Sequence, residues 1–497
     1  MHFLGLDIGT SSVKAVLVDD RQVVVAQAST PVTTHHQRPG WFEQDPDDWW
    51  SACERAVAML RSSTAAAFSD VSGIGLSGQM HGAVILDAAQ QPIRPAILWN
   101  DGRAVAECAA LAAAVPDVAT IAGVIPMPGF TAPKLLWLRR HEPEAFAQAR
   151  RIVLAKDYVR LKLTGEVATD MCDAAGTLML DERRRNWADA ILAAVGVGHG
   201  QLPRLLEGSA PSGMLRRELA TAWGIDRPVV VAAGAGDIAA GAVGIGAVDD
   251  GNGFISLGTS AQIFFCRNDY RPKPETLIHA FAHALPGRWF EMAALLNGAR
   301  CLDWVARLLG TDPSALLAEV EAKYRGPSSV LFLPYLAGER TPHNDPEARG
   351  VFANLEYATG PTDLVQAILE SVAFSLRDGF NAFGQAVEAE SILPIIGGGS
   401  RSRFWVQIIA SVLGRPLARG AGGENGPAFG AARLARLAVT GEDARAVCTR
   451  PAYDEVIEPD PDLRKRYEAR YKNFRRLYRT LRRVREATED RLPAATP

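Results

Sequence analysis

One loop pattern occurs twice in this chain, and each copy follows an apolar run. The first copy is Asp-Ile-Gly-Thr-Ser-Ser at residues 7–12, and the second is Ser-Leu-Gly-Thr-Ser at residues 256–260. Both offer glycine N–H groups and hydroxyl groups, which suit an anion that is held closely from several sides. Because the copies begin the two halves of the chain, they indicate an internal duplication. Repeated folds of this kind place their ligand in the cleft between the halves.

An acidic residue lies between the two loops. Asp237 is surrounded by small residues in Ala-Ala-Gly-Ala-Gly-Asp-Ile-Ala-Ala-Gly at residues 232–241, which leaves room for a substrate to approach. Two phosphate clamps that flank one acid predict phosphoryl transfer. That chemistry needs positioning, charge neutralisation and one base near the acceptor hydroxyl, and it needs no covalent nucleophile.

A third glycine cluster occupies residues 397–399. It follows an apolar strand predicted at residues 392–396 and precedes a helix predicted at residues 404–412. Backbone N–H groups at a helix N-terminus suit a nucleotide's phosphates or the edge of its sugar. A glycine turn alone is a weak signal, but three such loops and an interior acid together form a specific set.

The length of 497 residues predicts two or three domains. Apolar runs at residues 3–8, 13–18 and 23–28 predict a meander of three strands, and Asp45 with Pro46 predicts the start of a helix that runs to about Arg61. We expect an N-terminal domain at 1–247 with a mostly helical insertion at about 104–225, a C-terminal domain at 248–440 and a helical tail at 441–497.

Composition excludes several classes of function. A net charge of −3 argues against a nucleic-acid partner. The N-terminus has no basic and apolar leader, and no run reaches the ~18 to 20 apolar residues that span a bilayer, so we expect no membrane partner and a cytoplasmic location. Six scattered cysteines without a Cys-x-x-Cys pair predict reduced thiols rather than a zinc site or a disulfide framework.

The C-terminal tail combines an aromatic stripe with positive charge. Eleven Lys or Arg residues lie between Arg464 and Arg485, and apolar residues recur at helical spacing from Leu463 to Val484. Two interpretations follow. The helix either binds a membrane surface or another anion, or it docks on the protein by its aromatic stripe and leaves its basic face in water.

Several motifs resemble the sugar-kinase, actin and heat-shock ATPase superfamily, and within it the FGGY carbohydrate kinases. The resemblance spans about residues 3–440, and its most specific segments are residues 40–46, 77–82, 98–103, 128–137, 156–158, 333–342 and 426–432. It implies an α/β fold of duplicated actin-like (ribonuclease H-like) domains with a central cleft. It also implies ATP-dependent phosphorylation of a ketopentose, D-xylulose, in xylose catabolism, with another ketose such as ribulose or a polyol as the alternative.

The resemblance also implies roles for individual residues. Asp237 would be the base that takes the proton from the terminal hydroxyl of the sugar, and Asp7 would lie at the Mg²⁺–ATP phosphates as the metal ligand. The sugar would contact Met80 and His81, with Trp99, Asn100, Asp101 and Arg103 nearby. The phosphates would lie against Gly9, Thr10, Ser11, Gly258 and Thr259, and the adenosine against Gly398, Gly399 and Ser402.

Two positions depart from the family pattern. Ile238 stands where a polar Asn is often found, which leaves one sugar hydrogen bond unassigned. Asn354 stands where the second family signature has Gly, and we expect that change to affect the local backbone more than the chemistry.

Four alternatives stay open at this point. His81 is either a second base or a neutral hydrogen-bonding partner of the sugar. His279 and His283 could share a metal if they lie on a helix, or they are ordinary core or surface residues. Lys14 is either a phosphate contact or a solvated strand residue.

The fourth alternative concerns the whole chain, which could be a sugar-responsive regulator that has lost catalysis. The presence of Asp7 and Asp237 argues against that interpretation. The sequence leaves a homodimer open.

Overall fold

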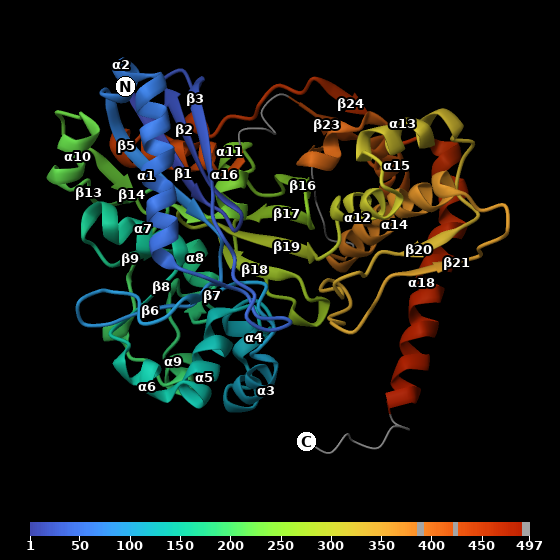
Figure 1. Cartoon of the computed structure of the whole chain (residues 1–497), viewed down its shortest axis with the longest axis horizontal. Coiled ribbons are helices and arrows are strands. Elements are labelled where there is room, and N and C mark those ends of the chain that lie inside the picture. The colour runs from blue at the N-terminus through green and yellow to red at the C-terminus, as the bar shows by residue number, and fades with distance from the viewer. Residues whose placement is uncertain (385–391, 421–425, 490–497) are drawn as a thin grey trace.

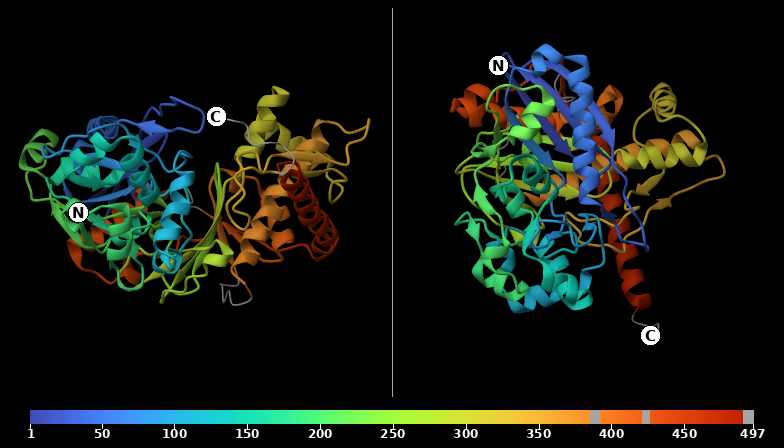
Figure 2. Two further views of the ribbon diagram at one scale, coloured as in Figure 1. Left: turned by 90° about the horizontal axis from the view of Figure 1, so that it is seen from below. Right: turned by 60° about the vertical axis from the view of Figure 1, so that its left-hand side comes forward.

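The computed structural model describes residues 1–384, 392–420 and 426–489, and it contains two bodies, each built around an open sheet (Figure 1). The N-terminal half forms the body on the left of Figure 1, and most of the C-terminal half forms the body on the right. The view from below shows the same separation into two bodies (left-hand view of Figure 2).

The first sheet has seven strands, in the order β13-β14-β5-β1-β2-β3, with β15 paired to β5. The predicted meander forms its centre, because β1 pairs antiparallel with β2 and β2 with β3, while β5 and β14 add parallel strands beyond β1. The strands are β1 (His2–Ile8), β2 (Ser12–Asp19), β3 (Val24–Pro31), β5 (Val71–Gly78), β13 (Pro211–Met214), β14 (Val230–Ala232) and β15 (Ala235–Gly236).

The second sheet repeats this arrangement. Its order is β18-β19-β17-β16-β22-β23-β24, in which β16 pairs antiparallel with β17, β17 with β19, and the parallel strands β22 and β23 follow β16. The predicted duplication is therefore visible in the topology. The strands are β16 (Gly253–Leu257), β17 (Ala261–Arg267), β18 (His279–Ala282), β19 (Trp289–Leu295), β22 (Leu393–Ile396), β23 (Leu417–Arg419) and β24 (Glu455–Ile457).

One helix of the C-terminal half lies in the N-terminal body. Helix α16 (Gly426–Thr440) packs on β1, β5 and on α11 (Asp237–Gly244). Gly5 and Gly75 make this packing possible, because a methyl group at either position would overlap with a backbone carbonyl oxygen of α16. The range 248–440, expected to be one domain, is thus interleaved with the first body, and no sequence pattern distinguishes α16 from the other buried helices.

The segment expected to be a helical insertion contains short strands as well as helices. Strands β8 (Arg151–Val153), β9 (Ala168–Asp170) and β12 (Arg204–Leu206) lie among its helices. Strand β13 and helix α10 (Arg217–Trp223) also fall within residues 104–225, yet β13 pairs with β14 as the edge of the first sheet. These strands were missed because three or four residues are too few to show a period of two.

The insertion also contacts the second sheet. The carboxylate of Glu182 accepts a 2.7 Å hydrogen bond from the backbone N–H of Ala282 in β18, and the carbonyl of Glu182 accepts a 2.8 Å bond from the indole N–H of Trp289. The hydroxyl of Tyr270 donates a 2.6 Å bond to the carbonyl of Thr120. The two bodies are therefore joined at this end of the cleft.

The remaining elements complete the two bodies. In the first body they are α1 (Pro46–Ser63), α2 (Ala65–Phe68), α3 (Val105–Ala114), α4 (Val118–Ile121), α5 (Thr131–His141), α6 (Pro143–Gln148), α7 (Ala155–Thr164), α8 (Met171–Ala175), α9 (Asp189–Val195), β4 (Glu43–Gln44), β6 (Val84–Leu86), β7 (Ala96–Ile97), β10 (Leu180–Asp181) and β11 (Asn186–Trp187). In the second they are α12 (Arg300–Leu309), α13 (Pro313–Lys323), α14 (Pro361–Ala382), α15 (Arg403–Leu413), β20 (Leu331–Leu333) and β21 (Val351–Ala353). Helix α17 (Ala444–Val447) follows α16.

The C-terminal helix α18 (Pro461–Glu489) packs against α15, α14 and β20. Its aromatic stripe is buried, since Tyr467, Tyr471, Phe474 and Tyr478 are each at most 6% exposed. The docked interpretation of this helix is therefore confirmed. The last eight residues of the expected tail lie outside the described residues. In the part of the chain that the structure describes, no helix has the length and apolar character needed to cross a membrane.

Candidate active site

A cavity of about 280 Å³ lies between the two bodies. The first half contributes polar side chains from Thr10, Gln79, His81, Trp99 and Asp237, and the second half contributes Ser256, Ser260, Gln262, His279 and Arg340. Thr10 lies in the β1–β2 turn and Ser260 in the β16–β17 turn, so the two copies of the repeated loop face the same cavity from opposite sides.

Asp237 begins α11 and borders this cavity. Its carboxylate accepts a 2.8 Å hydrogen bond from the backbone N–H of Ile238, and the helix N-terminus favours a negative charge there. The Asp237 side chain is exposed toward the cavity. Desolvation by the protein around the cavity, followed by the charge of Asp7, raises the pKa of Asp237 to about 7. A carboxyl group with that pKa is suited to accept a proton near neutral pH.

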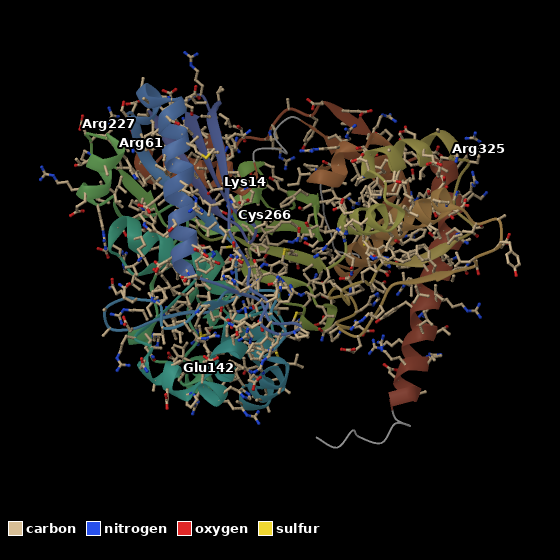
Figure 3. The ribbon with its side chains drawn as sticks, viewed as in Figure 1. Lys14, Arg61, Glu142, Arg227, Cys266 and Arg325 are labelled. Carbon is tan, nitrogen blue, oxygen red and sulfur yellow. The ribbon has the colours of Figure 1, made fainter. Side chains whose placement is uncertain are left out.

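Asp7 lies near the end of β1, between residues of two neighbouring strands. In the sheet register it stands opposite Ser77 on β5 and Lys14 on β2. The hydroxyl of Ser77 donates a 3.0 Å hydrogen bond to the Asp7 carboxylate. Burial raises the pKa of Asp7, while Ser77 and the charge of Lys14 act in the opposite direction. Lys14 itself is solvent-exposed on its strand (Figure 3).

The Thr10 turn is held by a network of side chains. The Thr10 hydroxyl donates to Gln79 at 3.2 Å and accepts from the indole N–H of Trp99 at 2.9 Å. Gln44 donates to the Thr10 carbonyl at 2.6 Å and accepts from Gln79 at 2.9 Å. Gly9 closes the turn through a 3.1 Å backbone bond to Ser12. The turn is therefore positioned before any ligand arrives.

His81 lines the cavity in an unusual backbone conformation, with φ of 70°. Its Nδ1 lies 2.7 Å from the carbonyl oxygen of Gly176, so Nδ1 carries the proton and Nε2 is left as an acceptor. Its own carbonyl accepts bonds from the side chains of Lys134 and Thr131, at 2.9 and 3.1 Å. Burial holds the pKa of His81 well below its usual range. The imidazole is therefore neutral at physiological pH, a form that both alternatives for His81 require.

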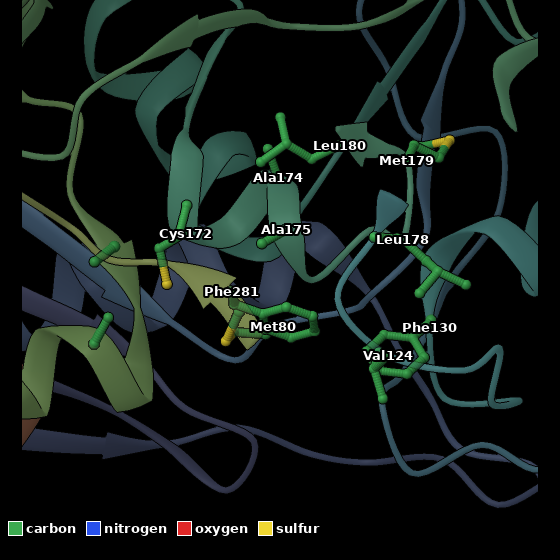
Figure 4. Close-up of a cluster of buried hydrophobic side chains, with 14 of the residues drawn as sticks. Met80, Val124, Phe130, Cys172, Ala174, Ala175, Leu178, Met179, Leu180 and Phe281 are labelled. Carbon is green, nitrogen blue, oxygen red and sulfur yellow. The ribbon is translucent and has the colours of Figure 1, made fainter. Parts of the chain in front are cut away.

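Met80 precedes His81 and joins the floor of the cavity to the hydrophobic core. It belongs to the buried cluster that also contains Phe130, Cys172 and Phe281 (Figure 4). Its side chain also meets Gly236, where a Cβ atom would lie 2.5 Å from the sulfur of Met80. Gly236 therefore lets Asp237 approach the Met80–His81 segment closely.

Three of the predicted sugar contacts lie outside the cavity lining. Arg103 forms ion pairs with Asp101 at 2.7 Å and with Glu43 at 2.8 Å, and it lies 3.8 Å from the ring centroid of Trp41. Asp101 also accepts a 2.7 Å bond from the backbone N–H of Phe42. These contacts tie the turn that follows Trp99 to the segment at residues 41–43. Asn100 lies in the same turn, and its side-chain oxygen is buried without a partner.

The β16–β17 turn is bound to the segment that follows β19. The N–H of Ala299 donates a 2.7 Å bond to the carbonyl of Gly258, and the N–H of Gly298 donates a 3.2 Å bond to Thr259. Neither Gly258 nor Thr259 lines the cavity, and neither do Gly9 and Ser11, whereas the adjacent Ser260 does.

The third glycine cluster forms a turn of 3₁₀ helix before α15 (η3, Gly398–Arg401). Gly398 is exposed, with open space where a side chain would project. Gly399 is buried against the side chains of Leu257 and Trp405, and the Ser402 hydroxyl caps α15 by accepting a 3.2 Å bond from the N–H of Trp405. Packing and helix capping therefore account for Gly399 and Ser402 without a bound nucleotide.

His279 and Arg340 line the cavity but were not among the predicted site residues. His279 lies on strand β18, so the two histidines do not lie on a helix, as a metal site shared by His279 and His283 would require. Both ring nitrogens of His279 are buried without a partner, and burial lowers its pKa to about 3. Across residues 1–384, 392–420 and 426–489, no three His, Cys, Asp or Glu side chains gather as a metal site.

The two departures from the family pattern lie in different places. Ile238 borders the cavity, so an apolar side chain occupies part of its wall. Asn354 lies beyond β21 and outside the cavity lining, with φ of 64°. Asn is one of the few residues besides Gly that adopt this conformation readily, so the change is accommodated in the backbone.

Two duplicated sheets of this topology, with glycine turns facing one cleft and a carboxylate at its base, define the class of sugar-kinase and actin-like ATPases. Family models match nearly the whole chain. Residues 2–244 match the N-terminal domain and residues 253–439 the C-terminal domain of the FGGY family of carbohydrate kinases. The chain belongs to this family and is a carbohydrate kinase.

Individual relatives agree with this assignment. A xylulose kinase from Escherichia coli (strain K12) is 45% identical over 481 residues, which cover 96% of this chain and 99% of that protein. A crystal structure described as a xyloylose kinase from Brucella ovis is 46% identical, covers 97% of this chain and 100% of that one, and has a TM-score of 0.93. A glycerol kinase from Plasmodium falciparum, 20% identical with a TM-score of 0.85 over 97% of this chain and 98% of that one, shows the shared fold alone.

Proposed function

We propose that this enzyme transfers the γ-phosphoryl group of ATP to the terminal hydroxyl of D-xylulose and yields D-xylulose 5-phosphate. The observation that carries the proposal is the position of Asp237, at the start of α11 and bordering the cavity that both repeated turns face. The similarity to xylulose kinases over nearly the full length of the chain favours D-xylulose as the acceptor.

Asp237 acts as the general base in this proposal. Its carboxylate takes the proton of the terminal hydroxyl while that oxygen bonds to the γ-phosphorus and the bond between this phosphorus and its bridging oxygen breaks, which releases ADP. A positioned base contributes roughly 10²- to 10⁴-fold to the rate. The pKa near 7 supports this role, because the base is largely deprotonated just above neutrality.

The two turns that contain Thr10 and Ser260 support phosphate binding from both sides of the cavity. Gly398 is open toward solvent and suits the adenosine end of the nucleotide. His81 offers Nε2 as an acceptor for a sugar hydroxyl, and Trp99 borders the same space. Asp101 and Arg103 act indirectly, by tying the turn that follows Trp99 to the segment at residues 41–43.

Mg²⁺ fits this site as a partner of the nucleotide phosphates. It binds oxygen ligands and keeps several waters, so it is commonly held by one or two carboxylates and substrate phosphates. Asp7 is a carboxylate of that kind, and the described residues provide no cage of three or more acidic or histidine ligands. When bound, the ion would neutralise charge on the transferred phosphoryl group.

The acceptor is the part of this proposal that needs a direct test. A panel of ketoses and polyols, which includes D-xylulose, ribulose and glycerol, should be assayed with ATP and Mg²⁺ for ADP release. We expect the highest kcat/KM for D-xylulose. If another ketose or a polyol gives a higher kcat/KM, the enzyme is still a carbohydrate kinase but its preferred sugar is not D-xylulose. The question is open to experiment because Ile238 makes part of the cavity wall apolar.

A further inference from the structure

Arg340 extends from the second body into the cavity, where it has no fixed partner of its own. Its guanidinium carbon lies 5.9 Å from the ring centroid of Trp99. Gly129 makes room for it, since a Cβ atom there would lie 3.2 Å from an Arg340 nitrogen. Within the described residues the guanidinium makes no hydrogen bond and no ion pair. The Arg340 guanidinium is therefore free to donate hydrogen bonds to the oxygen atoms of a sugar that enters between Arg340 and His81.

A tight hairpin at residues 339–345 carries Arg340. Glu339 and Asp345 exchange two backbone hydrogen bonds of 2.9 and 2.8 Å, and the N–H groups of His343 and Asn344 donate to the carbonyl of Arg340 at 2.6 and 2.5 Å. One side of the hairpin is attached to the segment after β19, because the Glu339 carboxylate accepts a 2.6 Å bond from the N–H of Leu296.

The C-terminal helix holds the other side of the hairpin. The Asp345 carboxylate accepts a 2.9 Å bond from the hydroxyl of Tyr478 and a 2.5 Å bond from Arg485. The ring of His343 stacks on Tyr478 with a centroid distance of 3.9 Å. Both Tyr478 and Arg485 lie in the second half of α18, which Figure 1 shows running down the outer edge of the second body.

We infer that the second half of α18 is a positioning element of the sugar pocket: Tyr478 and Arg485 hold the hairpin so that Arg340 contacts the sugar. This inference rests on the proposed function for the identity of the acceptor. It gives the second half of α18 a role in substrate affinity in addition to its role in stability. Arg340 is the residue through which this role acts on the sugar.

Tyr478→Phe tests the inference, because it removes the hydroxyl and keeps the ring that stacks on His343. We expect the Kd for D-xylulose, measured by calorimetry without nucleotide, and the sugar KM to rise about threefold to tenfold, the size of one lost hydrogen bond. The KM for ATP should stay within about twofold. Arg485→Ala, a change at a partly exposed side chain, should act in the same direction.

Tyr467→Phe is the matched control. Tyr467 lies on the same helix and its hydroxyl is also buried, at 2.8 Å from the hydroxyl of Tyr324 and 3.4 Å from the carboxylate of Glu370, away from the hairpin. We expect this variant to lower the unfolding temperature and to leave the sugar Kd unchanged. An equal loss of sugar affinity in both variants would show that α18 supports only the general stability of the fold.

A double-mutant cycle with Arg340→Ala identifies the route of the effect. If Tyr478 acts through Arg340, adding Tyr478→Phe to Arg340→Ala changes the sugar Kd no further. Additive losses, or an unchanged sugar Kd in Tyr478→Phe alone, would overturn the inference. If the parent enzyme prefers a sugar other than D-xylulose, the same cycle is measured with that sugar. A wrong assignment of the sugar can therefore be distinguished from a wrong assignment of the role of α18.

Discussion

Desolvation and the negative charge of Asp7 together raise the pKa of Asp237, so the carboxylate near the end of β1 acts on the carboxylate at the start of α11. Asp7 is itself buried and its pKa is raised as well. Two carboxyl groups in one enclosed region oppose each other's ionisation. A cation near Asp7 would therefore favour the deprotonated, proton-accepting form of Asp237.

The dependence of the rate on pH follows from this pair. A base is active when deprotonated, so kcat/KM for the sugar should rise tenfold per pH unit below the pKa of Asp237 and level off above about 7. The profile should be measured at fixed Mg²⁺ and ATP from about pH 5.5 to about pH 9. A profile that falls across this range as the pH rises would contradict the assignment of Asp237 as the base.

Replacement of Asp237 should remove turnover and spare binding. Asp237→Asn is expected to lower kcat by roughly 10²- to 10⁴-fold, equivalent to about 3 to 5 kcal/mol, because the proton acceptor is lost. Calorimetry should show that ATP and D-xylulose still bind. A folded variant with kcat within about threefold of the parent would refute the mechanism.

His81→Ala should separate the sugar site from the nucleotide site. The change removes an acceptor from the cavity, and a sugar hydroxyl left without its partner costs about 1 to 3 kcal/mol. We expect weaker binding of D-xylulose and nearly unchanged binding of ATP, both measured by calorimetry. The reverse pattern would mean that residues 80 and 81 lie at the nucleotide end of the cavity.

The two bodies should move toward each other and close the cleft when the sugar binds. Water can also accept the phosphoryl group, so an active site that was fully assembled without sugar would hydrolyse ATP. A site that closes only around the sugar avoids this loss. We expect weak ATPase activity without sugar, and a smaller radius of gyration by small-angle scattering with D-xylulose and a non-hydrolysable ATP analogue. Because Glu182 joins the insertion to β18 and Trp289, the motion should pivot near that end of the cleft. An unchanged radius together with an unchanged ATPase rate would argue against closure.

Gly75→Ala should destabilise the enzyme more than a typical surface change. The added methyl group would overlap with the carbonyl oxygen of Ala431 in α16, and such overpacking costs about 1 to 3 kcal/mol. Gly200→Ala is the control, since Gly200 is exposed and open space lies where its side chain would project. Thermal unfolding should show a lower midpoint for the first variant only.

Local patterns in the sequence predicted the elements that carry local signals. The strand predicted at residues 3–8 is β1 (His2–Ile8), and the helix predicted from Pro46 is α1, capped by Asp45 through a 2.9 Å bond to the N–H of Asp47. The docking of α18 followed from its aromatic spacing. These features depend on neighbours within one or two turns, which a sequence displays directly.

The parts that could not be predicted depend on contacts between distant segments. Arg340 lies in a motif that the sequence does display, but its entry into the cavity depends on the Asp345–Tyr478 contact, which joins residues 133 positions apart. The position of Arg103 outside the cavity lining likewise involves a distant partner, Glu43, with which it forms an ion pair. The roles of Gly399 and Ser402 in packing and capping were equally hidden, because a glycine turn before a helix looks the same whether or not it meets a ligand.

The position of α16 bears on how the chain folds as it is synthesised. A ribosome releases the strands of the first sheet long before residues 426–440 exist, so the face formed by Gly5 and Gly75 has no cover during most of translation. N-terminal domains commonly fold first as they emerge. In this enzyme the first body cannot be completed until α16 has been made, and α16 is translated after most of the second body.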